Sequence, residues 1–252
     1  MPYPSIILFG DSLTEQSFSL ERGGHGAALS NAYARRADVL NRGLSGYNSD
    51  WLLPFLNQLL VAQPLGVLLW IIMVGANDAC LPGFVHHVPL ERFKQNLKKM
   101  VSSIIQYSSQ QSNGTKTRIL LVSPPPIDVE MLKQYGPRGG ADRSAEVMVA
   151  YADAVLEVGQ QLAKDHDVAV LDFHELLSVT ATTQVVNPSA SRPVSLREYS
   201  TDGLHLGPKG YKVLFEAIQD IIERVWPDLT PENLPMKVKP PLTIDYMFRT
   251  HG

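Results

Sequence analysis

Three residues of the chain, Ser12, Asp202 and His205, are of the types that cleave acyl groups through a covalent intermediate. Ser12 lies in the stretch GDSLT (10–14), and Asp202 and His205 lie in TDGLH (201–205). A histidine that removes the proton from a serine hydroxyl makes that oxygen a nucleophile, and a carboxylate holds the imidazole in the required tautomer. Asp202 precedes His205 by three residues on an Asp-Gly turn, so its carboxylate can reach the ring. These residues predict acyl transfer from an ester through Ser12.

Acyl transfer also needs hydrogen-bond donors that are fixed in advance for the oxyanion of the tetrahedral intermediate. The backbone N–H of Ser12 would lie at the start of a helix, where the helix dipole favours negative charge. Gly46, in GLSGYNS (43–49), offers a backbone N–H with no Cβ in the way, and Asn77, in GAND (75–78), offers a side-chain NH₂. Gly43 lies in the same block and is an alternative to Gly46. We expect an oxyanion hole made by Ser12, Gly46 and Asn77.

Each of these residues also has a purely structural explanation. The sequence Ser12-Leu13-Thr14-Glu15 fits a capping box, in which Ser12 would only satisfy the amides of the first helix. Gly46, the Asn-Asp pair at 77–78 and the Asp-Gly pair at 202–203 all fit ordinary turns. A lone His205 fits a partly buried, hydrogen-bonded side chain. The occurrence of all four stretches in this order favours the catalytic interpretation.

The elements that must position these residues follow from the hydrophobic pattern. Short apolar runs alternate with segments of helical periodicity, which predicts βαβ units and a mostly parallel sheet. We expect strands at Ser5–Phe9, Asp38–Asn41, Val67–Val74, Arg118–Ser123 and Val168–Asp172, and helices at Trp51–Leu60, Leu90–Gln110, Ala141–His166 and Pro208–Val225. The expected fold is a three-layer α/β/α sandwich, doubly wound around a five-stranded sheet. Ligands bind such sheets outside the carboxyl ends of the strands, and three of the four stretches directly follow a predicted strand.

Several segments rich in Pro, Gly, Ser or Thr are expected to be loops or arms. They are residues 124–140, residues 179–199, the cluster Gly23-Gly24-His25-Gly26, which we expect to be a mobile loop, and the tail 227–252. The catalytic domain is expected to span residues 1–226. The tail carries scattered apolar residues, so we expect it to pack on the domain or on a partner subunit. In the second case the protein would be a homodimer.

Composition excludes several other classes of protein. The chain of 252 residues has 22 basic and 25 acidic residues and no long run of one sign, so it lacks an electrostatic footprint for nucleic acid. Cys80 is the one cysteine, and the pair His86-His87 has no third ligand at useful spacing, so we expect no disulfide, metal or cofactor. The longest apolar stretch, Leu65–Val74, is shorter than the roughly 20 residues that span a bilayer. We expect a cytoplasmic protein without stable membrane association.

The four stretches resemble the sequence blocks of the GDSL, or SGNH, hydrolases, and the resemblance covers most of the chain. It implies a flavodoxin-like fold, a nucleophile at Ser12, an Asp-His pair at Asp202 and His205, and oxyanion donors at Gly46 and Asn77; the family spacing favours Gly46 over Gly43. GHGAALSNAYARRADVLNRGLSGYNSDW, VGANDAC and TDGLHLGPKGYKVL further resemble the isoamyl acetate-hydrolysing esterases. That resemblance implies short acyl chains, especially acetate esters of simple alcohols. The G-x-S-x-G elbow of α/β-hydrolases is missing, because Thr14 occupies its final glycine position.

The residues around the four blocks are largely apolar, which favours a small neutral ester as substrate. They are Leu13, Leu44, Tyr47, Trp51, Leu81 and Leu204. Tyr47 and Trp51 could equally pack a helix on the sheet. The same site could also serve an acyltransferase, a carbohydrate deacetylase or a thioesterase. The alternative of another class is a binding module that keeps the fold and in which Ser12 only caps its helix.

Overall fold

Five strands form one parallel sheet that divides the molecule into layers. The computed structural model describes residues 3–62, 66–110, 117–183 and 196–237. The strands are β1 (Ser5–Gly10), β2 (Asp38–Gly43), β3 (Val67–Met73), β4 (Arg118–Val122) and β5 (Val168–Leu171). All adjacent pairs run parallel in the order β2-β1-β3-β4-β5, which is the flavodoxin-like order. The prediction of a doubly wound, five-stranded sheet is confirmed.

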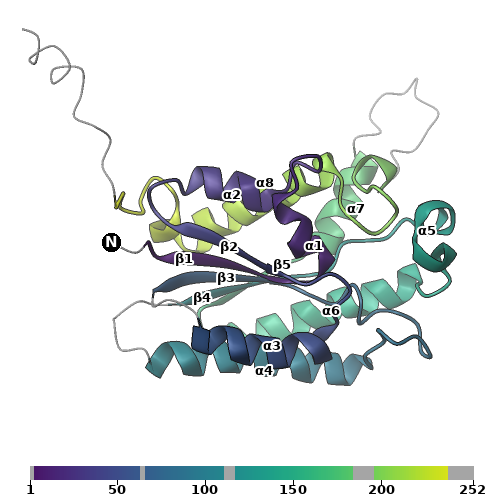
Figure 1. Cartoon of the computed structure of the whole chain (residues 1–252), viewed down its shortest axis with the longest axis horizontal. Coiled ribbons are helices and arrows are strands. Elements are labelled where there is room, and N and C mark those ends of the chain that lie inside the picture. The colour runs from purple at the N-terminus through teal and green to yellow at the C-terminus, as the bar shows by residue number, and fades with distance from the viewer. Residues whose placement is uncertain (1–2, 63–65, 111–116, 184–195, 238–252) are drawn as a thin grey trace, which may run out of the picture.

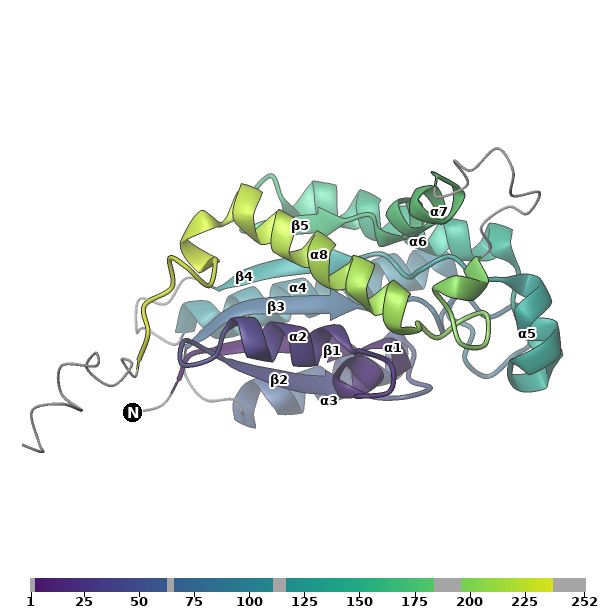
Figure 2. The ribbon, with the colours of Figure 1, turned by 90° about the horizontal axis from the view of Figure 1, so that it is seen from above.

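Helices cover both faces of this sheet (Figure 1). One face carries α3 (Ser49–Ala62), α4 (Leu90–Gln110) and α6 (Ala145–Leu162). The other carries α1 (Ser12–Glu15), α2 (His25–Ala32), α7 (Phe173–Thr183) and α8 (Pro208–Val225), and α8 runs beside α2 in Figure 2. Helix α5 (Val129–Tyr135) lies at the carboxyl ends of the strands. Short 3₁₀ helices occur at Gln16–Phe18, Pro137–Gly140, Leu196–Glu198 and Pro227–Leu229.

The burial pattern explains why the sequence forms these layers. Every residue of β1 and of β4 is buried, because a parallel sheet covered on both faces needs apolar side chains in both directions. Helix α8 instead buries one stripe of residues three or four apart and begins with Pro208 in its first turn, where the absent N–H costs nothing. The sheet thus forms the core, and the loops at the carboxyl ends of its strands are free to hold polar residues.

Two segments expected to be loops contain helices. Residues 124–140 include α5, whose first turn is capped by the Asp128 carboxylate, which accepts a hydrogen bond from Met131 N at 2.9 Å. Residues 179–199 begin within α7, which extends to Thr183, and they end with the buried Tyr199. Proline and glycine in the first segment, and threonine, serine and proline in the second, led to the expectation of loops. Residues 184–195 lie outside the described part of the chain.

The glycine cluster at 23–26 is not a loop either, because helix α2 begins at His25 with Gly24 as its N-cap. A Cβ on Gly24 would lie 2.1 Å from the carbonyl oxygen of Ser17. His25 is buried and stacks on Tyr211 of α8, with ring centroids 5.5 Å apart. Close packing of α2, rather than mobility, explains this cluster.

The beginning of the tail packs on the domain that precedes it. Leu229 is buried, and its carbonyl oxygen accepts a hydrogen bond from the Tyr33 hydroxyl at 2.8 Å. Further along, Lys237 N donates to Arg35 O at 2.8 Å. Residues 238–252, which carry most of the apolar residues of the tail, lie outside the described residues, so a homodimer contact through them stays a prediction. None of the described helices is both long and apolar enough to cross a bilayer.

Candidate active site

Ser12 lies at the junction between β1 and α1, as the first residue of the helix. The N-cap is Asp11, whose carboxylate accepts a hydrogen bond from Leu13 N at 3.0 Å. The Glu15 carboxylate does not reach back to Ser12 but accepts hydrogen bonds from the amide and hydroxyl of Ser45, both at 2.8 Å. The capping-box interpretation of Ser12 is therefore wrong, and its hydroxyl is left for another partner.

That partner is His205, whose Nε2 lies 2.9 Å from Ser12 Oγ. On the other side of the ring, Nδ1 lies 2.6 Å from Asp202 Oδ2. A carboxylate can only accept, so Nδ1 carries the proton and the lone pair of a neutral ring points from Nε2 toward the serine hydroxyl. Serine, histidine and aspartate thus form the continuous hydrogen-bonded chain that proton transfer from the hydroxyl requires.

The loop that carries Asp202 and His205 is held in place from several sides. Asp202 Oδ1 accepts hydrogen bonds from the amides of Leu204 at 3.0 Å and His205 at 2.8 Å. Gly203, which lies between Asp202 and Leu204, has φ +95°, and a Cβ at this position would lie 2.5 Å from Asp128 O. Asp128 N donates to Gly203 O at 2.9 Å. Helix α5 therefore braces this loop through its N-cap residue.

The hydrogen bonds to Asp202 keep its carboxylate ionised. Partial burial by itself raises the pKa of this group. Hydrogen bonds from the ring and backbone of His205, the charge of that ring and the amide of Leu204 outweigh burial and lower the pKa to about 2. The carboxylate is thus negative at neutral pH, which stabilises a positive imidazolium when His205 takes up a proton.

Gly46 occupies a turn that begins beside Ser12. Leu44 N donates to Gly10 O at 2.9 Å, and Tyr47 N donates to Leu44 O at 3.1 Å. Gly46 is the third residue of this four-residue turn and has φ +79°, a conformation that favours glycine. Gly43 has a different role. Its N–H donates to Asn41 Oδ1 at 2.9 Å, and a Cβ on Gly43 would lie 2.0 Å from Glu15 N. Gly43 is explained by packing of β2 on α1.

Asn77 follows β3 and is buried, with 6% of its surface exposed. Its Nδ2 donates to Tyr47 O at 2.8 Å, which links the third sequence block to the turn of the second. An amide nitrogen has two N–H groups, so one remains after this bond is made. The side chain of the neighbouring Asp78 is used otherwise, since Oδ1 accepts from Ser49 N at 2.9 Å.

Two buried carboxyl groups lie close to these residues. Burial raises the pKa of Asp11 to about 6, against the opposing effects of the Leu13 amide and the charges of His205 and Arg143. Burial raises the pKa of Asp78 to about 7, although hydrogen bonds from Ser49 lower it. Burial thus favours the protonated form of both carboxyl groups.

Arg143 is the residue of this region that the sequence did not reveal. It precedes α6, is 8% exposed, and donates to the carbonyl oxygen of Ala76 and, at 3.2 Å, to Asn77 Oδ1. Arginine is otherwise among the residues that are mostly exposed. No motif surrounds it in the sequence, and the segment was expected to be helical from Ala141, so nothing marked its side chain as part of the site.

The six apolar residues expected around the site differ in exposure, and two of them, Leu44 and Leu81, are half-buried. Leu13 and Leu204 are buried in the core, whereas Tyr47 and Trp51 are 38% and 40% exposed. The two aromatic rings meet edge to face with centroids 6.1 Å apart, and Trp51 meets His86 in the same way at 5.5 Å. Packing of a helix on the sheet therefore does not fully account for Tyr47 and Trp51, because a large part of each ring stays exposed.

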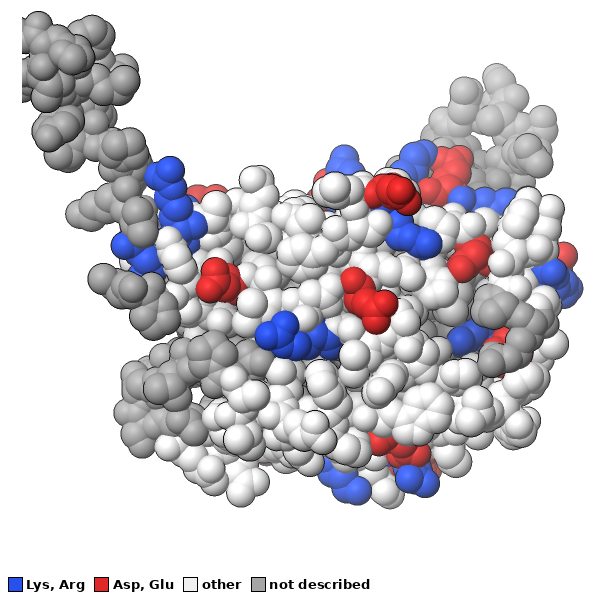
Figure 3. Space-filling view, in the orientation of Figure 1, with Lys and Arg blue, Asp and Glu red and all other residues white. Residues whose placement is uncertain are grey.

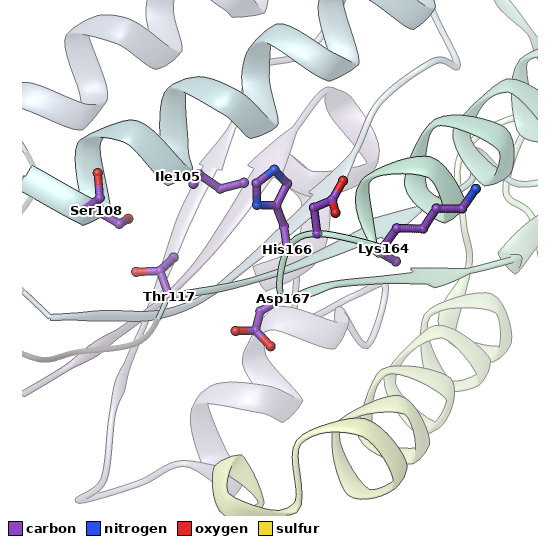
Figure 4. Close-up of a pocket in the computed structure, with 9 residues that line it drawn as sticks. Ile105, Ser108, Thr117, Lys164, His166 and Asp167 are labelled. Atoms are coloured by element: carbon purple, nitrogen blue, oxygen red, sulfur yellow. The ribbon is translucent and has the colours of Figure 1, made fainter.

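Other features of the surface are remote from this site. A hollow between α4 and the turn after α6, shown in Figure 4, lies at the amino ends of β4 and β5, the opposite edge of the sheet from Ser12.

Acidic and basic side chains are interspersed on the face shown in Figure 3. Among the described residues, no group of three or more His, Cys, Asp or Glu is placed to hold a metal ion.

Comparison with known proteins places the chain in a family. The model of the GDSL-like lipase/acylhydrolase family matches residues 8–213. A GDSL esterase/lipase of Arabidopsis thaliana is 37% identical over 228 residues, covering 84% of this chain and 83% of its relative. The isoamyl acetate-hydrolyzing esterase of Saccharomyces cerevisiae is 31% identical over 249 residues, covering 95% of this chain and 94% of the yeast protein.

A solved structure has the same doubly wound α/β/α fold. The lipase/acylhydrolase of Enterococcus faecalis superposes with a TM-score of 0.62 at 22% identity, covering 94% of this chain and all of that one. The chain belongs to the GDSL-like lipase/acylhydrolase family, as the resemblance of its four blocks implied. It is a carboxylic ester hydrolase, similar in sequence over nearly its whole length to the yeast enzyme.

Proposed function

We propose that this hydrolase is a serine esterase that cleaves small, short-acyl esters, above all acetate esters, through an acyl-Ser12 intermediate. The observation that carries the proposal is the pair of short contacts on His205, 2.9 Å from Nε2 to Ser12 Oγ and 2.6 Å from Nδ1 to Asp202 Oδ2. This arrangement is what a serine needs to become a nucleophile near neutral pH.

In the first half of the reaction, Ser12 Oγ attacks the carbonyl carbon of the ester while its proton moves to His205 Nε2. The oxyanion that forms accepts hydrogen bonds from the backbone N–H groups of Ser12 and Gly46 and from the second N–H of the Asn77 amide. Asp202 stabilises the imidazolium. The intermediate then expels the alcohol, which takes the proton from His205, and the acyl group stays on Ser12.

In the second half, a water molecule replaces the alcohol. His205 takes a proton from this water as the oxygen attacks the acyl carbon, and the same donors hold the second oxyanion. Collapse of this intermediate returns the proton from His205 to Ser12 Oγ and releases the carboxylic acid. Each proton that leaves an oxygen is thus returned, and the enzyme needs no other reactant than water.

The substrate class follows from the surroundings of the site and from the relatives. The exposed faces of Tyr47 and Trp51 offer apolar contact for the alcohol part of a small ester. The yeast relative is named for isoamyl acetate, an ester of a short acid and a branched alkyl alcohol. We therefore assign this chain to acetate esters of small apolar alcohols.

Hydrolysis of a series of esters tests the proposal. kcat/KM should be highest for acetyl esters, fall as the acyl chain lengthens from two to eight carbons, and vanish in Ser12→Ala. A preference for long acyl chains would contradict the proposed substrate class.

The contact with the alcohol is tested by Trp51→Ala, which should raise KM for isoamyl acetate several-fold and leave methyl acetate nearly unchanged. Val61→Ala is the matched control, because Val61 is an exposed apolar residue at the far end of the same helix α3. Equal effects of Trp51→Ala on both esters would show that the indole does not contact the alcohol.

A further inference from the structure

Building on the proposed function, we infer that Arg143 is a positioning residue of the oxyanion hole. Its guanidinium holds the side-chain amide of Asn77 by the oxygen, so that the nitrogen, and not the oxygen, faces the position of the oxyanion. No motif of the sequence points to this residue, and it makes no contact of its own with the reacting atoms.

The geometry around the amide carries the inference. Arg143 Nη2 donates to Asn77 Oδ1 at 3.2 Å, and Nη1 donates to the backbone oxygen of Ala76, the preceding residue. On the other side, Asn77 Nδ2 donates to Tyr47 O at 2.8 Å. The amide is thus fixed through its oxygen and through one of its two N–H groups, and the other N–H is the one available to a substrate.

Hydrogen-bond polarity makes this arrangement specific for one orientation. The oxygen and nitrogen ends of an asparagine amide are nearly the same size, so packing alone does not distinguish them. A guanidinium only donates and a backbone carbonyl only accepts. Turning the Asn77 amide over would set its NH₂ against the donors of Arg143 and its oxygen against Tyr47 O. Either contact is repulsive, and the donor needed for the oxyanion would be lost.

The charge of Arg143 acts in the same direction. The side chain is 8% exposed, and its nearest carboxylate contact, from Nε to Asp142 Oδ1, is long at 4.0 Å. A buried positive charge next to the Asn77 amide polarises it, which strengthens its N–H as a donor to a developing negative charge.

Arg118 shows what a buried arginine does when its role is structural. It is 9% exposed, lies at the amino end of β4, and pairs with the carboxylate of Asp228 at 2.5 Å. Arg143 instead directs its donors at two neutral carbonyl oxygens beside the proposed site. Arg118 is therefore a matched control of similar burial.

The test compares Arg143→Met, Asn77→Ala and the double variant, with Arg118→Met as control, by hydrolysis of p-nitrophenyl acetate and by thermal unfolding. Loss of a donor costs roughly 10²–10³ in kcat, so loss of its support in Arg143→Met should lower kcat about 10- to 100-fold, with little change in KM. The double variant should be no more than about threefold slower than Asn77→Ala, because coupled residues are not additive. Arg118→Met should lose thermal stability and keep its kcat.

Arg143→Lys serves if Arg143→Met does not fold. A lysine keeps the charge but cannot form the two-pronged contact with Ala76 O and Asn77 Oδ1, so kcat should still fall. A folded Arg143 variant with wild-type kcat overturns the inference, and so do kcat losses that multiply fully in the double variant. The proposed function predicts that a fluorophosphonate labels Ser12 in the wild-type enzyme. If this label forms while the Arg143 variants keep the wild-type kcat, only the inference about Arg143 fails.

Discussion

The hydroxyl of Tyr211 in α8 donates a hydrogen bond to the carbonyl oxygen of Leu13 at 2.8 Å. This bond links the last helix of the domain to the first. Leu13 is adjacent to Ser12, and α8 directly follows the loop that carries His205. The bond is buried and joins positions 198 residues apart. It helps to explain how Ser12 and His205, which are 193 positions apart, come within 2.9 Å of each other.

Asp202→Asn should lower kcat for p-nitrophenyl acetate by a factor on the order of 10⁴, as loss of the aspartate does in serine proteases with this triad. An asparagine can turn its NH₂ toward Nδ1, which would shift the ring proton to Nε2 and remove the base from Ser12. Steady-state kinetics on the folded variant measures the loss. An Asp202→Asn enzyme with nearly normal kcat would remove Asp202 from the reaction.

Asn77→Ala should lower kcat roughly 10²- to 10³-fold, the usual effect of deleting one oxyanion donor, and leave more activity than Ser12→Ala. KM should change little, because the lost hydrogen bond forms mainly in the transition state. Kinetics of both variants on the same ester provides the comparison. A mild effect on kcat would displace Asn77 from the oxyanion hole.

Gly46→Ala and Gly43→Ala separate the two glycines of the second block. Alanine at 46 meets only His86 Nε2, at 3.9 Å, so its cost is the strain of φ +79°, about 1–2 kcal/mol, and a displaced N–H. Alanine at 43 would meet the backbone of Glu15 at 2.0 Å and should destabilise the fold more. Gly43→Ala should therefore lose more stability in urea unfolding, and Gly46→Ala should lose more kcat. Greater loss of kcat in a folded Gly43→Ala variant would assign the donor to Gly43.

Asp78→Asn should make stability less dependent on pH. Burial raises the pKa of Asp78 from 3.8 to about 7, so the folded protein keeps a proton that the unfolded chain loses, and stability falls as pH rises through this window. Asparagine keeps the acceptor for Ser49 N and does not ionise. Relative to wild type, the variant should gain on the order of a few kcal/mol in unfolding free energy between pH 4 and pH 8.

Urea unfolding at each pH measures this gain. The exposed Asp165, changed to asparagine, is the control and should follow the wild-type curve. Parallel curves for wild type and Asp78→Asn would show that the carboxyl of Asp78 does not titrate in this range.

The sheet could be predicted because β1, β3, β4 and β5 are largely apolar runs, and even the more polar edge strand β2 was located. Helices α2 and α5 could not, since glycine and proline dominate their surroundings. What makes them helical is tertiary: Gly24 fits against the Ser17 carbonyl, and Asp128 caps α5. Composition carries no information about either contact.

The site shows the same division between pattern and packing. The types and order of Ser12, Asn77 and His205 were visible in the sequence, and the structure brings Ser12 and His205 into contact. The capping box at Ser12–Glu15 matched its pattern and was wrong, because Asp11 takes the cap and Glu15 binds Ser45. Arg143 could not be found, because its role depends on which oxygens the fold places in front of it.

The catalytic role of Ser12 is tested most directly by reaction of the enzyme with a fluorophosphonate probe, followed by mass spectrometry of its peptides. A probe of this kind forms a bond with an activated serine and ignores one that only caps a helix. Labelling at Ser12 should be rapid and stoichiometric, severely slowed in His205→Ala and absent in Ser12→Ala. Labelling that spares Ser12, or that is equally fast without His205, would contradict this role.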